Sequence, residues 1–173
     1  MTAVLAGLML AAGTSACASD GSGDAAPGEV DAASAFVAMI EWQTGEQEPV
    51  VTDAGETELP VIYVVAAAGE TIDVGVQAAV AEATVDMATV RFADEATDAF
   101  DDDLDGEPVR DQGSMLLVGA IPVAAPTIVV DLVRYVAADR PEPFQLEITA
   151  DDLGPGTIGQ RSAIVTSATS PTE

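Results

Sequence analysis

Between residues 34 and 166, apolar residues recur mostly at every second position, which is the spacing of a half-buried β-strand. The first such segment places Phe36, Ala38, Ile40 and Trp42 on one face of an extended chain. Further candidate strands, separated by segments rich in proline, glycine and aspartate, cover residues 61–65, 89–92, 115–121, 127–136, 144–149 and 162–166. The pattern predicts seven to eight short strands.

Residues 72–85 fit either a helix or a strand. Val76 and Val80 have helical spacing, but the apolar residues of the segment also alternate as they would in a strand. Because another strand follows closely at residues 89–92, we favour a hairpin that turns near Asp86.

Short strands, frequent turns and little helix predict an all-β fold. We expect an antiparallel β-sandwich, Ig-like by architecture, with seven to eight strands and one short crossover helix. The chain has a single cysteine, so it lacks the cysteine pair that braces the two sheets of Ig domains. This single domain is expected to cover residues 34–166, followed by a frayed tail at 167–173. By analogy, such a fold hosts structural and binding roles more often than catalysis.

An apolar run of small residues covers Ala3–Ala16. As a helix this run would rise about 21 Å, too short for a hydrocarbon core of about 30 Å but typical of a signal peptide. Cys17 follows directly after Thr14-Ser15-Ala16. This segment resembles the lipobox of bacterial prolipoproteins, in which small residues precede a cysteine that is lipidated and becomes the new N-terminus. The resemblance covers residues 3–17 and implies a lipid anchor at Cys17.

The lipobox interpretation predicts a signal peptide at residues 1–16 and a lipidated cysteine with a flexible tether at 17–33. The tether follows from the small, polar and helix-breaking residues after Cys17. The protein would then be exported and held at the outer face of the cell membrane. One alternative is ordinary secretion, with cleavage at the small-x-small site Ala16-Cys17-Ala18. The other is that the apolar run is a helix in the core of the domain.

The chain carries 30 acidic residues against five arginines, without lysine or histidine, so its formal net charge is −25. Such a surface repels phosphate backbones and anionic lipid headgroups, which excludes nucleic acid and a polybasic membrane contact as partners. We prefer solubility as the reason for this charge over recruitment of a cationic partner. Without histidine and with one cysteine, the chain has no Ser-His-Asp or Cys-His pair and no thiolate zinc site.

Nine of the acidic residues fall within the eighteen positions Asp94–Asp111. At the start of this segment, Phe92, Ala96 and Phe100 are spaced four apart, which predicts the short crossover helix. The next residues, Asp101-Asp102-Asp103-Leu104-Asp105-Gly106, are similar to the first half of an EF-hand calcium loop. In such loops alternate carboxylates converge because the glycine permits a sharp turn.

The similarity implies a calcium site formed by the side chains of Asp101, Asp103 and Asp105 and the backbone carbonyl of Glu107. The twelfth position, however, is Gln112 instead of a bidentate glutamate, and a strand follows instead of a helix. We therefore favour a solvated acidic crossover that associates weakly with divalent cations over a tight site.

The sequence predicts a non-enzymatic cell-envelope lipoprotein with a monomeric, acidic ectodomain of structural or binding role. It indicates no catalytic residue and no cofactor other than calcium, and it does not indicate which protein or glycan the domain contacts. One alternative is a divalent-cation binding module built on the Asp101–Asp111 loop. Another is a carboxylate-only hydrolase such as a glycosidase, which needs two acids in a cleft with one raised pKa.

Overall fold

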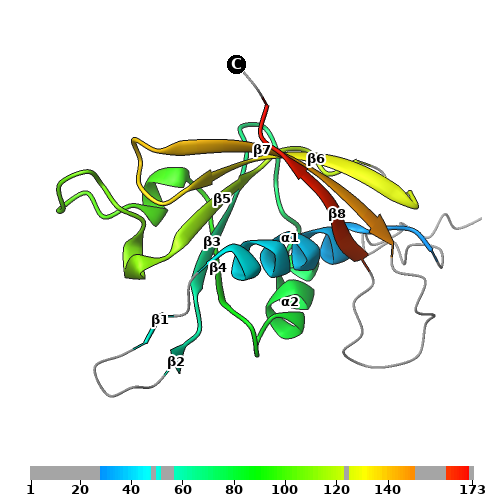
Figure 1. The fold of residues 1–173 in the computed structure, drawn as a ribbon, viewed down its shortest axis with the longest axis horizontal. Helices are drawn as coiled ribbons and strands as arrows, with labels where there is room; N and C mark the ends of the chain where they lie inside the picture. The colour runs from blue at the N-terminus through cyan, green and yellow to red at the C-terminus, as the bar shows by residue number, and fades with distance from the viewer. Residues whose placement is uncertain (1–27, 48–49, 52–56, 123–124, 151–162, 172–173) are drawn as a thin grey trace, which may run out of the picture.

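The computed structural model describes residues 28–47, 50–51, 57–122, 125–150 and 163–171 (Figure 1). Its helices and strands are α1 (Ala32–Glu46), β1 (Val50–Val51), β2 (Thr57–Glu58), β3 (Val61–Ala66), α2 (Val74–Ala83), β4 (Thr89–Ala93), β5 (Ser114–Val118), β6 (Thr127–Tyr135), β7 (Pro141–Ala150) and β8 (Ala163–Thr169). Strands β1 and β2 form a small antiparallel pair beside the main sheet. Among the described helices, none is long and apolar enough to span a membrane.

The described part of the main sheet has six strands in the order β4, β3, β5, β6, β7 and β8. Strand β3 runs parallel to both of its neighbours, whereas β5 to β8 follow one another as antiparallel pairs. Parallel strands need a crossover connection. Helix α2 crosses from β3 to β4, and residues 94–113 cross from β4 to β5. The two crossovers pack against opposite faces of the sheet, because they contact alternate residues of β3.

The expectation of a β-rich domain is confirmed, and each of the six candidate strands from residue 61 onward corresponds to one of β3 to β8. The antiparallel, Ig-like sandwich is not confirmed. The described main sheet is one mixed layer, and the helices α1 and α2 cover its face where a sandwich would have a second sheet. Strand β8 continues to Thr169, which pairs with Gln145, so regular structure extends into the segment expected to fray.

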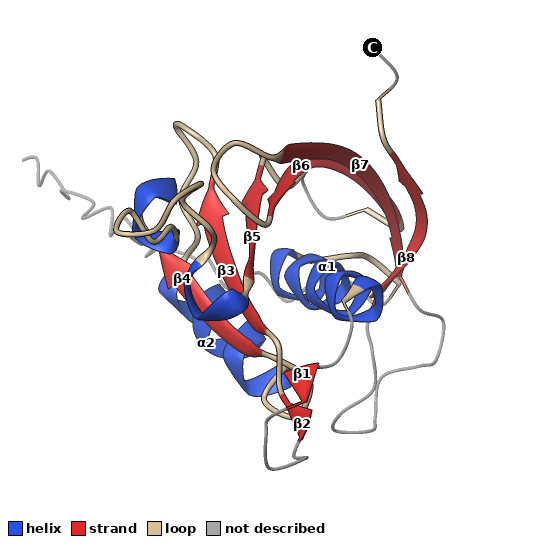
Figure 2. Cartoon of the chain, turned by 60° about the vertical axis from the view of Figure 1, so that its left-hand side comes forward, coloured by secondary structure: helices blue, strands red, loops and turns tan. Residues whose placement is uncertain are grey.

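Helix α1 replaces the strand predicted over residues 36–42, and that prediction was wrong. Asp31 caps the helix, because its side chain accepts a 2.7 Å hydrogen bond from the Ser34 N–H. The sheet curls around α1 (Figure 2) and buries residues over much of the helix surface. Met39 and Ile40, adjacent in sequence, are both fully buried. A helix enclosed in this way shows no narrow apolar stripe, which is why the period of 3.6 did not stand out.

The hairpin favoured for residues 72–85 was also wrong, because this segment contains helix α2. The Asp73 side chain accepts a 2.7 Å hydrogen bond from the Gly75 N–H at the start of the helix. At its end, the Thr84 N–H and hydroxyl both donate to the Val80 carbonyl, at 3.0 and 2.8 Å. A tight hairpin joins only antiparallel strands, so the parallel pairing of β3 with β4 requires a crossover here.

Residues 1–27, which include the predicted signal peptide and Cys17, lie outside the described residues. Val30 falls within the segment predicted as a tether. It is fully buried, and its N–H donates a 2.8 Å hydrogen bond to the Ala125 carbonyl. The folded part of the chain therefore begins before residue 34.

The core is divided between the two faces of the sheet. On the helix face, which α1 and α2 cover, the helices pack against inward residues of the main sheet, among them Ile62, Leu116, Val130 and Leu146. On the opposite face, called here the crossover face, a smaller cluster joins the sheet to residues 94–113; it comprises Tyr63, Val65, Ala99, Phe100, Val109 and Met115. The candidate site lies on the crossover face.

Candidate functional site

The crossover from β4 to β5, residues 94–113, has a fixed path over the sheet. It begins with a 3-10 turn at Ala96–Ala99, where the short helix was predicted, and ends with another at Arg110–Gln112. Between these turns, Phe100 forms a β-bridge with Val109, and its ring packs edge-on against Tyr135 with the ring centroids 5.8 Å apart. These contacts hold the acidic segment against the crossover face.

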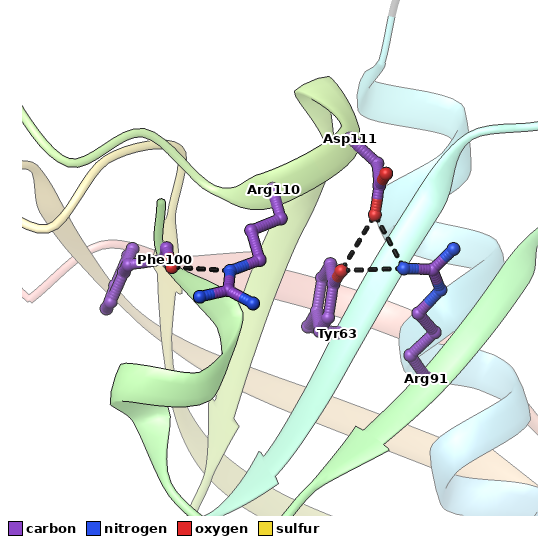
Figure 3. Close-up of polar contacts among 5 residues, drawn as sticks. All are labelled: Tyr63, Arg91, Phe100, Arg110 and Asp111. Atoms are coloured by element: carbon purple, nitrogen blue, oxygen red, sulfur yellow. Dashed lines mark hydrogen bonds and ion pairs between the residues drawn. The ribbon is translucent and has the colours of Figure 1, made fainter. Parts of the chain in front are cut away.

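A polar cluster of Tyr63, Arg91 and Asp111 ties the end of the crossover to the edge of the sheet (Figure 3). Tyr63 on β3 and Arg91 on β4 are register partners in the parallel sheet. The Tyr63 hydroxyl donates to Asp111 Oδ2 at 2.8 Å. Arg91 Nη1 donates to the same carboxylate oxygen at 2.6 Å and to the Tyr63 hydroxyl at 2.9 Å. Three segments that are distant in sequence therefore meet at one point.

Burial raises the pKa of the Tyr63 hydroxyl above its usual value of 10.0, and the hydrogen bond to Asp111 raises it further, while Arg91 acts in the opposite direction. The hydroxyl is therefore protonated at neutral pH and serves as a donor. The side chains of Arg91 and Asp111 are 49% and 44% exposed. Ion pairs this exposed contribute at most about 1 kcal/mol to stability, so the main effect of the cluster is to position the crossover.

The backbone around this cluster is strained at three residues that are not glycine. Glu107, Asp111 and Gln112 have φ values of 43°, 56° and 54°, in the left-handed region. Such conformations cost about 1–3 kcal/mol each and persist where surrounding contacts enforce them. At Gly113, directly after them, the chain is so close to β3 that an added Cβ would lie 2.5 Å from the Val61 carbonyl oxygen.

The structure brings together two of the four predicted calcium ligands, Asp101 and Asp103, and adds Asp102. One carboxylate oxygen from each of the three lies within 4.8 Å of the others, close enough to contact one cation. The search for alternate carboxylates missed Asp102, although the uninterrupted run of three aspartates was a signal for it. The Asp103 N–H also donates to Asp101 Oδ1 at 3.3 Å, which holds the first and third carboxylates near each other.

The remaining predicted ligands lie apart from this group. Among the described residues, Asp105 does not belong to the cluster of convergent carboxylates. The Glu107 carbonyl, expected to face the ion, accepts a 3.0 Å hydrogen bond from the Ala138 N–H. Gln112, at the closing position of the EF-hand pattern, lines a neighbouring groove. The segment therefore differs from an EF-hand loop, in which alternate positions converge.

Two adjoining depressions surround the polar cluster and share Arg91 and Asp111 in their walls. The first, called the acidic cleft, has a volume of about 610 Å³, and its other lining residues are Tyr63, Asp98, Asp101, Asp102, Asp103 and Arg110. The second, called the groove, has a volume of about 1100 Å³, and its apolar lining consists of Leu59, Pro60, Val61, Pro108, Val109 and Val136. The polar residues that also line the groove are Gln47, Glu58, Thr89 and Gln112, so a charged hollow adjoins one of mixed character.

This chain has no match among protein-family models, curated proteins or solved structures. Its function therefore has to be inferred from the chemistry of the site. A carboxylate-only hydrolase needs two facing acids, one with a raised pKa. In the acidic cleft, Asp111 is ion-paired with Arg91. The hydrolase hypothesis stays a prediction.

Sequence reasoning did not single out Tyr63, Arg91 and Asp111 as a set. Nothing in the local pattern marks them, because 28 residues separate the first two and 20 the last two. Only the parallel pairing of β3 with β4 makes Tyr63 and Arg91 neighbours.

Proposed function

We propose that this chain is a non-enzymatic cell-envelope lipoprotein whose β-rich domain binds a ligand in the groove and the acidic cleft. The observation that carries the proposal is the pair of adjoining depressions that share Arg91 and Asp111 of the polar cluster in their walls. Ligand sites are usually pre-formed hollows of about 300–1,000 Å³ with apolar walls and a few placed polar groups. The groove, at about 1100 Å³, is slightly larger than this range, and its walls combine apolar and polar side chains.

A photo-crosslinking residue in place of Val136 is expected to capture the ligand in native membranes. Val136 lines the groove and is 44% exposed. Val129, on β6, is 45% exposed and does not line the groove, so it is the matched control. We expect a discrete adduct with the substituted Val136 and none with the substituted Val129. Equal labelling at the two positions would count against a binding role for the groove.

The proposed anchor at Cys17 is supported by the lipobox-like residues 3–17. Each acyl CH₂ group buried in the membrane contributes about 0.8 kcal/mol, so a lipidated cysteine would hold the domain at the outer face of the cell membrane. The charge of −25 removes electrostatic attraction to anionic lipid as a second source of membrane binding.

Expressed in a bacterial host, the wild-type chain is expected to incorporate labelled palmitate and to sediment with the membranes. Cys17→Ala should lose both properties, while Ser19→Ala, two residues later, should keep them. Release of unlabelled wild-type protein with Ser19 at its N-terminus would establish ordinary secretion instead.

Divalent-cation binding is a second candidate function, supported by the convergent carboxylates of Asp101, Asp102 and Asp103. The cleft also contains a competing charge, because Arg110 Nη2 lies 3.9 Å from Asp102 Oδ1. A bound cation would have to coexist with this guanidinium group. We therefore expect weak binding.

Millimolar Ca²⁺ should raise the melting temperature more than sodium chloride of the same ionic strength. A ligand at ten times its Kd stabilises the folded state by about 1.4 kcal/mol, whereas salt acts by screening the self-repulsion of the acidic surface. Asp101→Asn combined with Asp103→Asn should abolish the calcium-specific part. The matched control is Glu46→Gln with Glu82→Gln, at exposed positions on α1 and α2. If Ca²⁺, Mg²⁺ and sodium chloride act alike, the triplet is only a solvated surface.

A further inference from the structure

We infer that the ligand of the groove and the acidic cleft is a peptide segment of a partner protein, in which an apolar side chain stands next to a lysine or arginine. The inference rests on the proposed function, since it names the class of ligand for the same site.

The acidic cleft attracts cations even though two arginines line it. Arg91 is already bound to Asp111 and the Tyr63 hydroxyl. The Arg110 guanidinium is held to the crossover, because its Nε donates a 2.7 Å hydrogen bond to the Phe100 carbonyl. Among the described residues, no arginine forms an ion pair with the other carboxylates of the cleft, those of Asp98, Asp101 and Asp103. These carboxylates therefore remain for a positively charged group of the ligand.

The groove adds apolar surface to the site, next to polar side chains that include Glu58. Leu59 and Val136 line it and are each 44% exposed, and Pro60 and Pro108 add further apolar surface. A single exposed aliphatic side chain is ordinary, but several gathered in one hollow favour a ligand that removes them from water. Arg91 and Asp111 line both the groove and the cleft, so a ligand that extends past these two side chains contacts both.

A peptide is the ligand that fits both depressions. A metal ion alone would leave the groove unfilled, and a purely apolar ligand would leave the carboxylates without a partner. The volumes of about 1100 and 610 Å³ together exceed the range of about 300–1,000 Å³ that is usual for one small ligand. Lysine and arginine combine an apolar stem with a charged head, and the chain's charge of −25 steers a basic partner towards it.

The inference can be tested by phage display. Random heptapeptides are selected for binding to the immobilised full-length chain at low ionic strength. We expect the enriched peptides to carry an apolar residue beside lysine or arginine. Synthetic copies should bind the Asp101→Asn, Asp103→Asn variant about three- to tenfold more weakly than wild type, the effect of losing two exposed ion pairs. Glu82→Gln with Asp86→Asn removes the same charge from α2 and the turn directly after it, and should leave the affinity unchanged because α2 covers the opposite face.

Three results would overturn the inference. The first is enrichment of peptides without basic residues. The second is equal weakening by the two double variants, which would show attraction by the overall charge and not by the cleft. The third is no enrichment above the bare support. In that case the photo-crosslinking residue at position 136 separates the two proposals, since an adduct there preserves the binding role with a different ligand, and its absence removes both.

Discussion

Met39→Ala and Ile40→Ala are each expected to lower the free energy of unfolding by about 2–5 kcal/mol. Both side chains are fully buried and belong to the cluster between α1 and the sheet. Removing either one takes away apolar contacts and leaves a cavity that the curved sheet can close only in part. Stability is expected to fall at both positions because the segment is a helix. In a strand, these sequence neighbours would lie on opposite faces, so only one of them would face the core.

Urea unfolding followed by the fluorescence of Trp42, which lies on α1 edge-on to Phe144, measures this effect. Glu46→Ala on the same helix is the control, because Glu46 is exposed and its replacement should change stability by at most about 0.5 kcal/mol. An effect at Met39 no larger than the control would contradict the packing of α1.

Gly113→Ala is expected to destabilise the domain by about 1–3 kcal/mol, the usual cost of forcing extra atoms into a packed site. The new Cβ would lie 2.5 Å from the carbonyl oxygen of Val61 and 3.1 Å from that of Arg110. Both contacts are to backbone atoms, which cannot rotate away as a flexible side chain can. The chain must therefore shift at the point where the crossover meets β3, and the groove should lose its shape with it, because Val61 and Gly113 both line it.

Gly45→Ala on α1 provides a control of opposite sign. Apart from its chain neighbours and the backbone of its own helix, a Cβ added at Gly45 would have no atom within 4 Å. Replacing a glycine inside a helix by alanine stabilises it by about 0.5–1 kcal/mol, because glycine loses more backbone freedom on folding. The two substitutions add the same methyl group, so urea unfolding should show a lower midpoint for Gly113→Ala and a higher one for Gly45→Ala. Wild-type stability in Gly113→Ala would show that the close approach to β3 is not rigid.

The strands from residue 61 onward could be predicted because their signal is local. Runs such as Val61–Val65 are rich in β-branched residues, which favour strands, and proline, glycine or aspartate nearby marks where the strands begin and end. Both signals are read from the segment and its immediate neighbours. The helices could not be predicted in the same way. The apolar residues of α1 fit the alternation of a strand, and they also fit a helix that is buried over much of its surface. Only the contacts with the curled sheet show that the segment is a helix.

The candidate site divides along the same line. The run Asp101-Asp102-Asp103 is a local feature, and the sequence indicated a cation-binding segment there with two of the three convergent residues. Asp105 is not among the convergent carboxylates, and the Glu107 carbonyl accepts a hydrogen bond from Ala138, a contact between distant segments that the local pattern does not contain. The polar cluster of Tyr63, Arg91 and Asp111 has no local signal of any kind.

By itself, the sequence determined which side chains this protein lacks for catalysis and metal binding, and that its net charge is negative. The missing histidine and the single cysteine exclude sites of this chain that need its histidines or several of its thiolates, and the charge of −25 predicts repulsion of phosphate backbones. Only the tertiary structure decided that β3 is flanked by two parallel neighbours. That pairing forces α2 and residues 94–113 onto opposite faces and brings Arg91 to Tyr63, because strand register depends on contacts between distant residues and not on the local pattern.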